Sequence, residues 1–310
     1  MKKDLLSVSD LSRNEVEQLV EQALQMKKGG TPSLLSGRTL ALLFEKPSLR
    51  TRVSFQMAMH QLGGHSIYLS PDEVGLGKRE PVADVARVLS RYVDGITART
   101  FSHETLRILA DHSPAPVINA LSDQEHPCQA LADLLTIYEK KGRFSGLTVA
   151  YIGDGNNVAN SLLLSACLVG IDFCLASPPG YDVKEQVLNQ GRRFAAFSGS
   201  QIRLAGNPNE AVKDADVIYT DVWSSMGQET EAEKRRLAFS GYQVDGELLS
   251  RAKRDVLFMH PLPAHPGEEI SPGLLDDPRS VVFDQAENRL HMQKALLARI
   301  LPSNPKGSDY

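Results

Sequence analysis

Strand-like apolar runs and helix-like segments alternate along most of the chain, and this alternation constrains the fold more than any other feature of the sequence. In the first half, the strand-like runs are residues 38–44, 65–69, 95–98 and 116–119, and the helix-like segments are residues 51–62, 81–91, 103–111 and 126–140. Strands that alternate with helices predict a parallel sheet covered by helices.

The same pattern starts again in the second half. Its strand-like runs are residues 147–152, 171–176, 201–205, 216–220 and 256–259, with one helix at about 157–169 and an amphipathic last helix at about 285–301. We expect the tail 302–310 to be frayed. Two successive patterns predict the α/β class, with two doubly wound parallel-sheet domains. In such domains ligands bind beyond the carboxyl ends of the strands, and we expect the active site in the cleft between the domains.

The length of 310 residues exceeds the size at which a single core usually stops growing, which also favours two domains. The polar, glycine-containing segment 140–146 is the best candidate for the boundary. We therefore predict a first domain at 1–141 and a second at 142–284, with the C-terminal helix region 285–310 packing back onto the first domain.

Composition excludes several functional classes. The net charge of -4 and the pI of about 6.1 argue against a dedicated nucleic-acid binder. The three cysteines have no metal-type spacing, which argues against a disulfide framework and a zinc site and fits a reducing compartment. No signal peptide and no apolar run of about 18 residues is visible. We expect a cytoplasmic protein that binds neither nucleic acid nor membrane.

A candidate anion site follows the first buried strand, where residues 44–52 are Phe-Glu-Lys-Pro-Ser-Leu-Arg-Thr-Arg. These residues open a helix, and a helix N-terminus offers free N–H groups and a positive dipole end to a phosphate. Ser48 and Thr51 add hydroxyl groups, and the Arg50 guanidinium matches phosphate oxygens in a bidentate way. A capped helix with surface arginines explains the same residues equally well.

Two further motifs carry candidate residues. Arg99, in Ala-Arg-Thr-Phe, falls at the carboxyl end of a strand, although a surface arginine is the simpler explanation. His126, in His-Pro-Cys-Gln, lies at a helix start, where the macrodipole disfavours an imidazolium, so a neutral ring could donate to a carbonyl oxygen. Gln129 lies one turn later on the same side and could accept from an amide NH2 group.

Ser-x-Arg-Thr-Arg, Ala-Arg-Thr-Phe and His-Pro-x-Gln, in this order, resemble the aspartate/ornithine carbamoyltransferase family along essentially the whole chain. The resemblance implies a carbamoyl phosphate-binding first domain and an amino-acid-binding second domain. It implies that Ser48, Leu49, Arg50, Thr51 and Arg99 hold the phosphate and that Thr51, Arg99 and His126 polarise the carbonyl. By the same resemblance Gln129 orients the carbamoyl NH2 group, and Leu262 and Arg289 complete the carbamoyl phosphate site.

Four later segments resemble the ornithine branch of the family, and they begin at Gly153, Asp221, His260 and Ala286. The resemblance implies that the amino-acid end of ornithine is held by Asn157, Asp221, Ser225 and Met226. It implies transfer of the carbamoyl group to the side-chain amine of ornithine, giving citrulline and phosphate in arginine biosynthesis. It also implies a homotrimer, or a larger assembly of trimers, and it implies no cofactor and no metal.

The sequence departs from the family pattern at three positions. Leu49 replaces the usual threonine, and Gly75 stands where many members have a glutamine that serves the neighbouring subunit, a role that Lys78 or Arg79 could take. Pro261 replaces the cysteine that lies beside the reacting amine in the ornithine branch, and His-Pro-Leu-Pro is the form of the aspartate branch. Pro261 and Leu262 thus form the loop expected beside the reacting amine.

Several alternatives stay open. Another acceptor within the family is the first, with aspartate, an acylated ornithine, putrescine or lysine as candidates, although Ala264 follows Pro263 where aspartate would favour an arginine. A Rossmann-type dehydrogenase is suggested by Gly153 and Gly155, but Val158 replaces the third glycine of that fingerprint. A non-catalytic binding protein is disfavoured because every residue expected to hold carbamoyl phosphate is present except for the change at Leu49.

Overall fold

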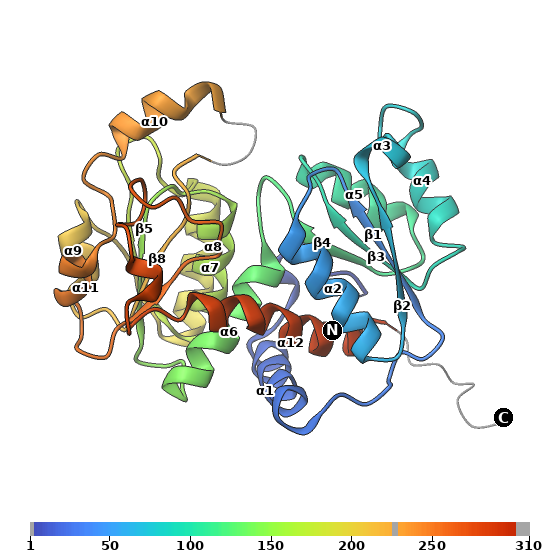
Figure 1. Cartoon of the computed structure of the whole chain (residues 1–310), viewed down its shortest axis with the longest axis horizontal. Coiled ribbons are helices and arrows are strands. Elements are labelled where there is room, and N and C mark those ends of the chain that lie inside the picture. Colours follow the sequence, from blue (N-terminus) through green and yellow to red (C-terminus); the bar gives the residue numbers. More distant parts are fainter. Residues whose placement is uncertain (1–2, 225–228, 302–310) are drawn as a thin grey trace. The chain divides into compact units, whose positions relative to one another are not determined.

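The computed structural model describes residues 3–224 and 229–301 of the chain, which divides into two compact units. The first unit comprises residues 1–135 and 287–310, and the second comprises residues 136–286. The chain leaves the first unit within helix α6 (Pro127–Lys141) and returns to it within helix α12 (Val282–Ile300), the long red helix in Figure 1.

The first unit is built on a parallel sheet of four strands in the order β2-β1-β3-β4. The strands are β1 (Thr39–Phe44), β2 (His65–Leu69), β3 (Gly95–Arg99) and β4 (Val117–Leu121). Besides α6 and α12, the helices are α1 (Arg13–Gly29), α2 (Leu49–Gln61), α3 (Pro71–Val74), α4 (Val82–Leu89) and α5 (His103–His112), and a 3₁₀ turn covers Val8–Asp10.

The second unit is built on a parallel sheet of five strands in the order β7-β6-β5-β8-β9. The strands are β5 (Thr148–Ile152), β6 (Asp172–Ala176), β7 (Ile202–Leu204), β8 (Val217–Thr220) and β9 (Leu257–Met259). The helices are α7 (Asn157–Val169), α8 (Glu185–Ser198), α9 (Pro208–Val212), α10 (Ala232–Ala238) and α11 (Gly246–Ser250), with 3₁₀ turns at Glu229–Glu231 and Leu274–Asp276.

The central strands are buried on both faces, and this is why they appear in the sequence as continuous apolar runs rather than alternating ones. In the first unit, α4 and α5 cover one face of the sheet and share a core with β1 and β3. In the second unit, α9 and α11 cover one face, and Figure 1 shows α7 and α8 on the other. The second sheet is therefore the middle layer of an α/β/α sandwich.

The strand order of each sheet decides where a ligand can bind. In the first unit the order reverses between β1 and β3, and in the second it reverses between β5 and β8. Doubly wound sheets bind ligands outside the carboxyl ends of the strands at this reversal. Arg50 lies in the segment after β1, and Arg99 is the last residue of β3. Asn157 and Asp221 lie in the segments after β5 and β8, respectively. Each unit thus has predicted site residues at its reversal point.

The predicted α/β class with two doubly wound parallel-sheet domains is confirmed by these two sheets. Two long helices, α1 and α8, lie outside all of the elements predicted from the sequence. The tail 302–310, which we expected to be frayed, lies outside the described residues. Among the residues described, no helix has the length and apolar character needed to span a membrane.

Candidate functional site

Helix α2 begins directly after β1, with Ser48 as its N-cap. The Ser48 Oγ atom accepts a hydrogen bond from the Thr51 N–H group (3.4 Å) and donates one to Thr51 Oγ1 (3.0 Å). The remaining N–H groups of the first turn and the positive end of the helix dipole favour an anion at this point. Leu49 is 77% exposed and its side chain has no hydrogen-bond donor, so only its backbone can serve such an anion.

Three guanidinium groups accompany this helix start. The Arg289 Nη2 atom donates a hydrogen bond of 2.6 Å to Thr51 Oγ1, although the two residues are 238 positions apart in the sequence. Arg99 is only 7% exposed, and burial followed by the charges of Arg289 and Arg50 lowers its pKa to about 10. Burial also lowers the pKa of Arg50. The surroundings of Arg99 and Arg50 thus disfavour the charged form of each guanidinium group. A bound dianion would offset this cost and stabilise the cluster.

His126 is buried near the same charges, immediately before α6. Burial, followed by the charges of Arg289, Arg99 and Arg50, lowers the pKa of His126 well below its ordinary value. The imidazole is therefore neutral near physiological pH, with one nitrogen that donates and one that accepts. A neutral ring can donate a hydrogen bond to a carbonyl oxygen without adding another positive charge to the cluster.

Gln129 lies in the first turn of α6 and is only 1% exposed. Its backbone N–H group bonds the carbonyl oxygen of His126 at 3.1 Å, and its Nε2 atom donates to Asp133 Oδ1 at 2.8 Å. Its Oε1 atom has no hydrogen-bond partner among the described residues. Hydrogen bonds and charge interactions therefore link a single group in the first unit, namely Ser48, Arg50, Thr51, Arg99, His126, Gln129 and Arg289.

In the second unit, Asn156 connects two of the strands that meet at the reversal point. Its Oδ1 atom caps α7 by accepting from the N–H groups of Val158 (2.9 Å) and Ala159 (3.0 Å). Its Nδ2 atom donates to Asp221 Oδ2 at 2.8 Å. Because Asn156 occupies these two N–H groups, the start of α7 offers little to a pyrophosphate, which argues against the dehydrogenase alternative.

Asp221 and Asn157 are the two predicted amino-acid-binding residues that the structure describes. Burial raises the pKa of the Asp221 carboxyl group, and the neighbouring His260 and the hydrogen bond from Asn156 oppose this rise. Asn157 is the first residue of α7 and is half-buried. Ser225 and Met226, the other two predicted residues, lie outside the described residues.

The loop after β9 is held by a buried histidine. The His260 N–H group bonds Gln285 Oε1 (2.9 Å), His260 Nε2 lies 3.2 Å from Glu269 Oε1, and the Leu262 N–H group bonds His260 Nδ1 (2.9 Å). Because Nδ1 accepts, Nε2 carries the ring proton and donates to Glu269. Pro261 is buried, and Leu262 has a positive φ of 57°, which is unusual for a residue other than glycine. The loop predicted to lie beside the reacting amine thus has a defined conformation.

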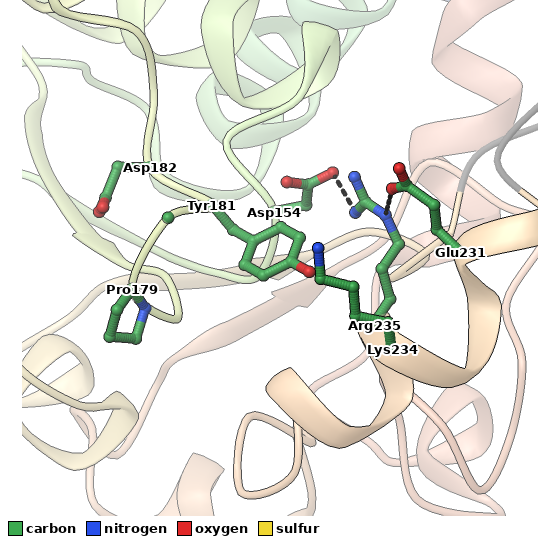
Figure 2. A pocket seen from close by; sticks show the side chains of 8 residues that line it. Asp154, Pro179, Tyr181, Asp182, Glu231, Lys234 and Arg235 are labelled. Carbon is green, nitrogen blue, oxygen red and sulfur yellow. Dashed lines mark hydrogen bonds and ion pairs between the residues drawn. The ribbon is translucent and has the colours of Figure 1, made fainter.

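A polar cavity of about 440 Å³ opens near the carboxyl ends of β5 and β6 in the second unit. Figure 2 shows Arg235 between two carboxylates, bonded to Asp154 (2.9 Å) and paired with Glu231 (3.6 Å). Gly155 is required here, because a Cβ atom would lie 2.3 Å from the Val183 backbone nitrogen. Charged side chains of both signs line the cavity, and no prediction from the sequence included it.

Asp133 and Asn156 hold predicted site residues but were not identified from the sequence. Asp133 lies four positions after Gln129, where helical spacing brings side chains together, and Asn156 stands directly before a helix, where capping residues occur.

His265, Glu268 and Glu269 bring ligand-type atoms within 4.8 Å of one another among the described residues. His265 and Glu268 are exposed, whereas the buried Glu269 already accepts hydrogen bonds from His260 and from the His265 N–H group, and the sequence predicts no metal.

Comparison with known proteins gives consistent matches over both units. Residues 3–139 match the family model "Aspartate/ornithine carbamoyltransferase, carbamoyl-P binding domain", and residues 145–300 match "Aspartate/ornithine carbamoyltransferase, Asp/Orn binding domain". The ornithine carbamoyltransferase of Anoxybacillus flavithermus is 52% identical over 303 residues, which cover 96% of each chain. An ornithine carbamoyltransferase of Pyrococcus furiosus named as anabolic has the same identity and coverage.

Solved structures agree with these sequence matches. The structure of the ornithine carbamoyltransferase from Pyrococcus furiosus superposes with a TM-score of 0.93 at 52% identity and covers 96% of each chain. A structure of an N-acetyl-L-ornithine transcarbamylase superposes with a TM-score of 0.88 at 31% identity, covering 97% of this chain and 100% of the other.

Proposed function

Because the chain belongs to the aspartate/ornithine carbamoyltransferase family, we propose that it transfers the carbamoyl group of carbamoyl phosphate to the side-chain amine of L-ornithine. The products are L-citrulline and phosphate, and the enzyme is a transferase of arginine biosynthesis. One observation carries the proposal more than any other: three guanidinium groups, Thr51 and a neutral His126 gather in the unit that matches the carbamoyl-P binding domain.

Carbamoyl phosphate needs a site for a dianion and a site for a polarised amide-like carbonyl. The start of α2 and the guanidinium groups of Arg50, Arg99 and Arg289 suit the phosphate. Thr51 Oγ1 already accepts from Arg289, so its own proton is available to an oxygen of the ligand. His126 donates to the carbonyl oxygen, and Gln129 Oε1 accepts from the carbamoyl NH2 group. Leu262 of the second unit is proposed to contact the same ligand through its backbone.

The chemical step is attack of the neutral δ-amine on the carbonyl carbon. The new C–N bond forms, negative charge grows on the carbonyl oxygen, and the C–O bond to phosphate then breaks. Arg99, Thr51 and His126 stabilise the oxyanion, and such a donor commonly contributes on the order of a hundredfold or more in rate. Arg50 and Arg289 stabilise the leaving phosphate, which takes the proton lost by the amine.

The acceptor is proposed to be ornithine because its amino-acid end needs an anion for the α-ammonium group and amide donors for the α-carboxylate. Asp221 is fixed by Asn156 and can pair with the ammonium group, and Asn157 offers an amide. Ser225 and Met226 are proposed to complete this contact. Pro261 lacks the thiol that the usual cysteine would provide beside the reacting amine. We propose that the conformation of the loop alone places Leu262 there.

We also propose that the enzyme is a homotrimer in the cytoplasm. Leu49, Val53 and Met57 form an exposed apolar stripe at helical spacing on α2, which packs against the edge strand β2, where Ile67 is also exposed. A second copy of the chain is the occupant that this stripe favours. Lys78 and Arg79 are exposed on their loop and could serve the neighbouring subunit. The three cysteines are free thiols, as expected of a reducing compartment.

Light scattering tests the trimer. The wild type should have a mass three times 34.0 kDa, and Val53→Glu should lower it, because a charge in the apolar stripe opposes burial. A monomeric wild type would contradict the proposal.

Acceptor choice tests the function directly. Ureido-product formation from carbamoyl phosphate should be measured with ornithine, acetylornithine, putrescine, lysine and aspartate in parallel. We expect turnover with ornithine and a kcat/KM lower by about tenfold or more with the others. Acetylornithine and putrescine alter or remove the groups that Asp221 and Asn157 would bind, lysine is one methylene longer, and aspartate has no side-chain amine. Turnover with only another acceptor would refute ornithine specificity, and no turnover with any of them would refute the carbamoyltransferase activity.

A further inference from the structure

Helix α6 contains a buried pair of polar side chains, and only one of them has a role in the proposed reaction. Gln129 and Asp133 are four residues apart and are 1% and 0% exposed, respectively. Gln129 Nε2 donates to Asp133 Oδ1 at 2.8 Å. The carboxyl group of Asp133 is therefore withdrawn from solvent. An acidic group in such a place is costly unless it makes a specific interaction.

The interaction that Asp133 makes fixes the orientation of the Gln129 amide. A glutamine amide has a donating end and an accepting end, and rotation by half a turn exchanges them. A carboxylate can only accept, so it binds the NH2 end and excludes the rotated orientation. The Oε1 atom is then held at the other end, where it is buried and has no hydrogen-bond partner among the described residues. Such an acceptor favours a ligand that brings a donor.

We propose that Asp133 is a positioning residue that makes the site selective for a carbamoyl group by holding Gln129 with its acceptor toward the ligand. This inference rests on the proposed function, since it takes carbamoyl phosphate as the ligand. The carbamoyl NH2 group donates to Gln129 Oε1. If the amide were rotated, two NH2 groups would face each other, and both would lose their partner.

Acetyl phosphate separates this role from a structural one. It has the same phosphate and carbonyl groups as carbamoyl phosphate but carries a methyl group in place of NH2, so it cannot donate to Gln129. The wild type should therefore bind carbamoyl phosphate at least tenfold more tightly than acetyl phosphate, which is the size of effect expected of one buried hydrogen bond. Equal affinity of the wild type for the two ligands would overturn the proposal without any variant.

The variant Asp133→Asn keeps the shape of the side chain but offers Gln129 either a donor or an acceptor. The KM for carbamoyl phosphate and the inhibition constants of acetyl phosphate and inorganic phosphate should be measured with ornithine saturating. We expect the KM for carbamoyl phosphate to rise about tenfold or more, while both inhibition constants stay within twofold. Asp216→Asn is the matched control, because it neutralises another buried carboxyl group, in the second unit, and should leave all three constants unchanged.

A double-mutant cycle completes the test. In a Gln129→Met background there is no amide to orient, so adding Asp133→Asn should leave the ratio of the carbamoyl phosphate and acetyl phosphate constants unchanged. Two results would overturn the positioning role. One is that Asp133→Asn weakens the binding of carbamoyl phosphate, acetyl phosphate and inorganic phosphate to the same extent. The other is that Asp133→Asn causes the same loss of selectivity in the wild type and in the Gln129→Met variant. A wild type with no carbamoyl transfer would instead refute the proposed function, so the two failures are distinguishable.

Discussion

Replacing Arg50 with methionine should stabilise the free protein and weaken the binding of carbamoyl phosphate, two effects of opposite sign. Arg50 contributes positive charge to a cluster that already contains Arg99 and Arg289. The pKa of Arg99 falls to about 10, and its causes in order of size are burial, Arg289 and Arg50. The ordinary pKa of an arginine is about 12.5, so this fall corresponds to roughly 3 kcal/mol.

Arg50 is the smallest of these three causes, so it accounts for at most a third of that energy. The unfavourable interaction with Arg99 is present wherever both side chains are charged, which includes neutral pH. Arg50→Met should therefore raise the free energy of unfolding of the ligand-free protein by up to about 1 kcal/mol. It should also remove charged hydrogen bonds to the phosphate that are worth about 1.5–3 kcal/mol, so that binding weakens about 10- to 150-fold. Turnover should fall on the order of a hundredfold or more.

Urea unfolding at 25 °C, with and without carbamoyl phosphate, measures both effects. Carbamoyl phosphate should raise the unfolding midpoint of the wild type and leave that of Arg50→Met almost unchanged. Arg52→Met is the control, because Arg52 lies on the same helix but stacks on the Tyr68 ring at 3.9 Å, and it should keep the ligand effect. A less stable ligand-free Arg50→Met that still gained the full ligand effect would refute the assignment of Arg50 to the phosphate.

Three further outcomes are expected. With carbamoyl phosphate saturating, initial rates measured from about pH 6 to 9 should rise with pH, because the attacking amine has an ordinary pKa near 10.4. No inflection from His126 should appear there, because its pKa lies well below 6.5, and a flat profile would contradict attack by the neutral amine. A thiol reagent at about pH 8 should label the folded protein slowly and should label all three cysteines after unfolding. The reason is that burial raises the pKa of Cys128 and Cys167 to about 12. Fast labelling of the folded protein would argue against this burial. Asp221→Asn should raise the KM for ornithine about tenfold or more and leave that for carbamoyl phosphate within twofold, and steady-state kinetics showing the reverse pattern would move Asp221 to the other ligand.

The sequence alone determined the fold class, and it did so through burial. A strand covered on both faces must be apolar at consecutive positions, so β1, β3, β5 and β8 were visible as short apolar runs between helices. Local chemistry was visible as well. Ser48 before a helix-like segment predicts a helix start, and the structure places it as the N-cap of α2.

Helix starts differ in how clearly the sequence marks them. Helix α1 begins with Ser12 and Glu15, which form a capping box, and this spacing can be recognised in a sequence. Helix α8 begins at Glu185 after Lys184, whose side chain makes no capping hydrogen bond, so its start carries a weaker signal. Asp133 follows Gln129 at helical spacing, but spacing alone does not show that both side chains are buried.

Only the tertiary structure decided which distant residues meet. The strand orders, and with them the reversal points after β1 and β5, depend on how strands pair across the chain, which no local pattern encodes. Arg289 reaches Thr51 across 238 positions, and Asn156 joins the start of α7 to Asp221 after β8. The lowered pKa of His126 likewise depends on burial and on three arginines from separate segments. The sequence thus set the type of each element and the chemistry at its ends, because these depend on neighbours in the chain, whereas folding set the electrostatics of the site, because charge and burial depend on neighbours in space.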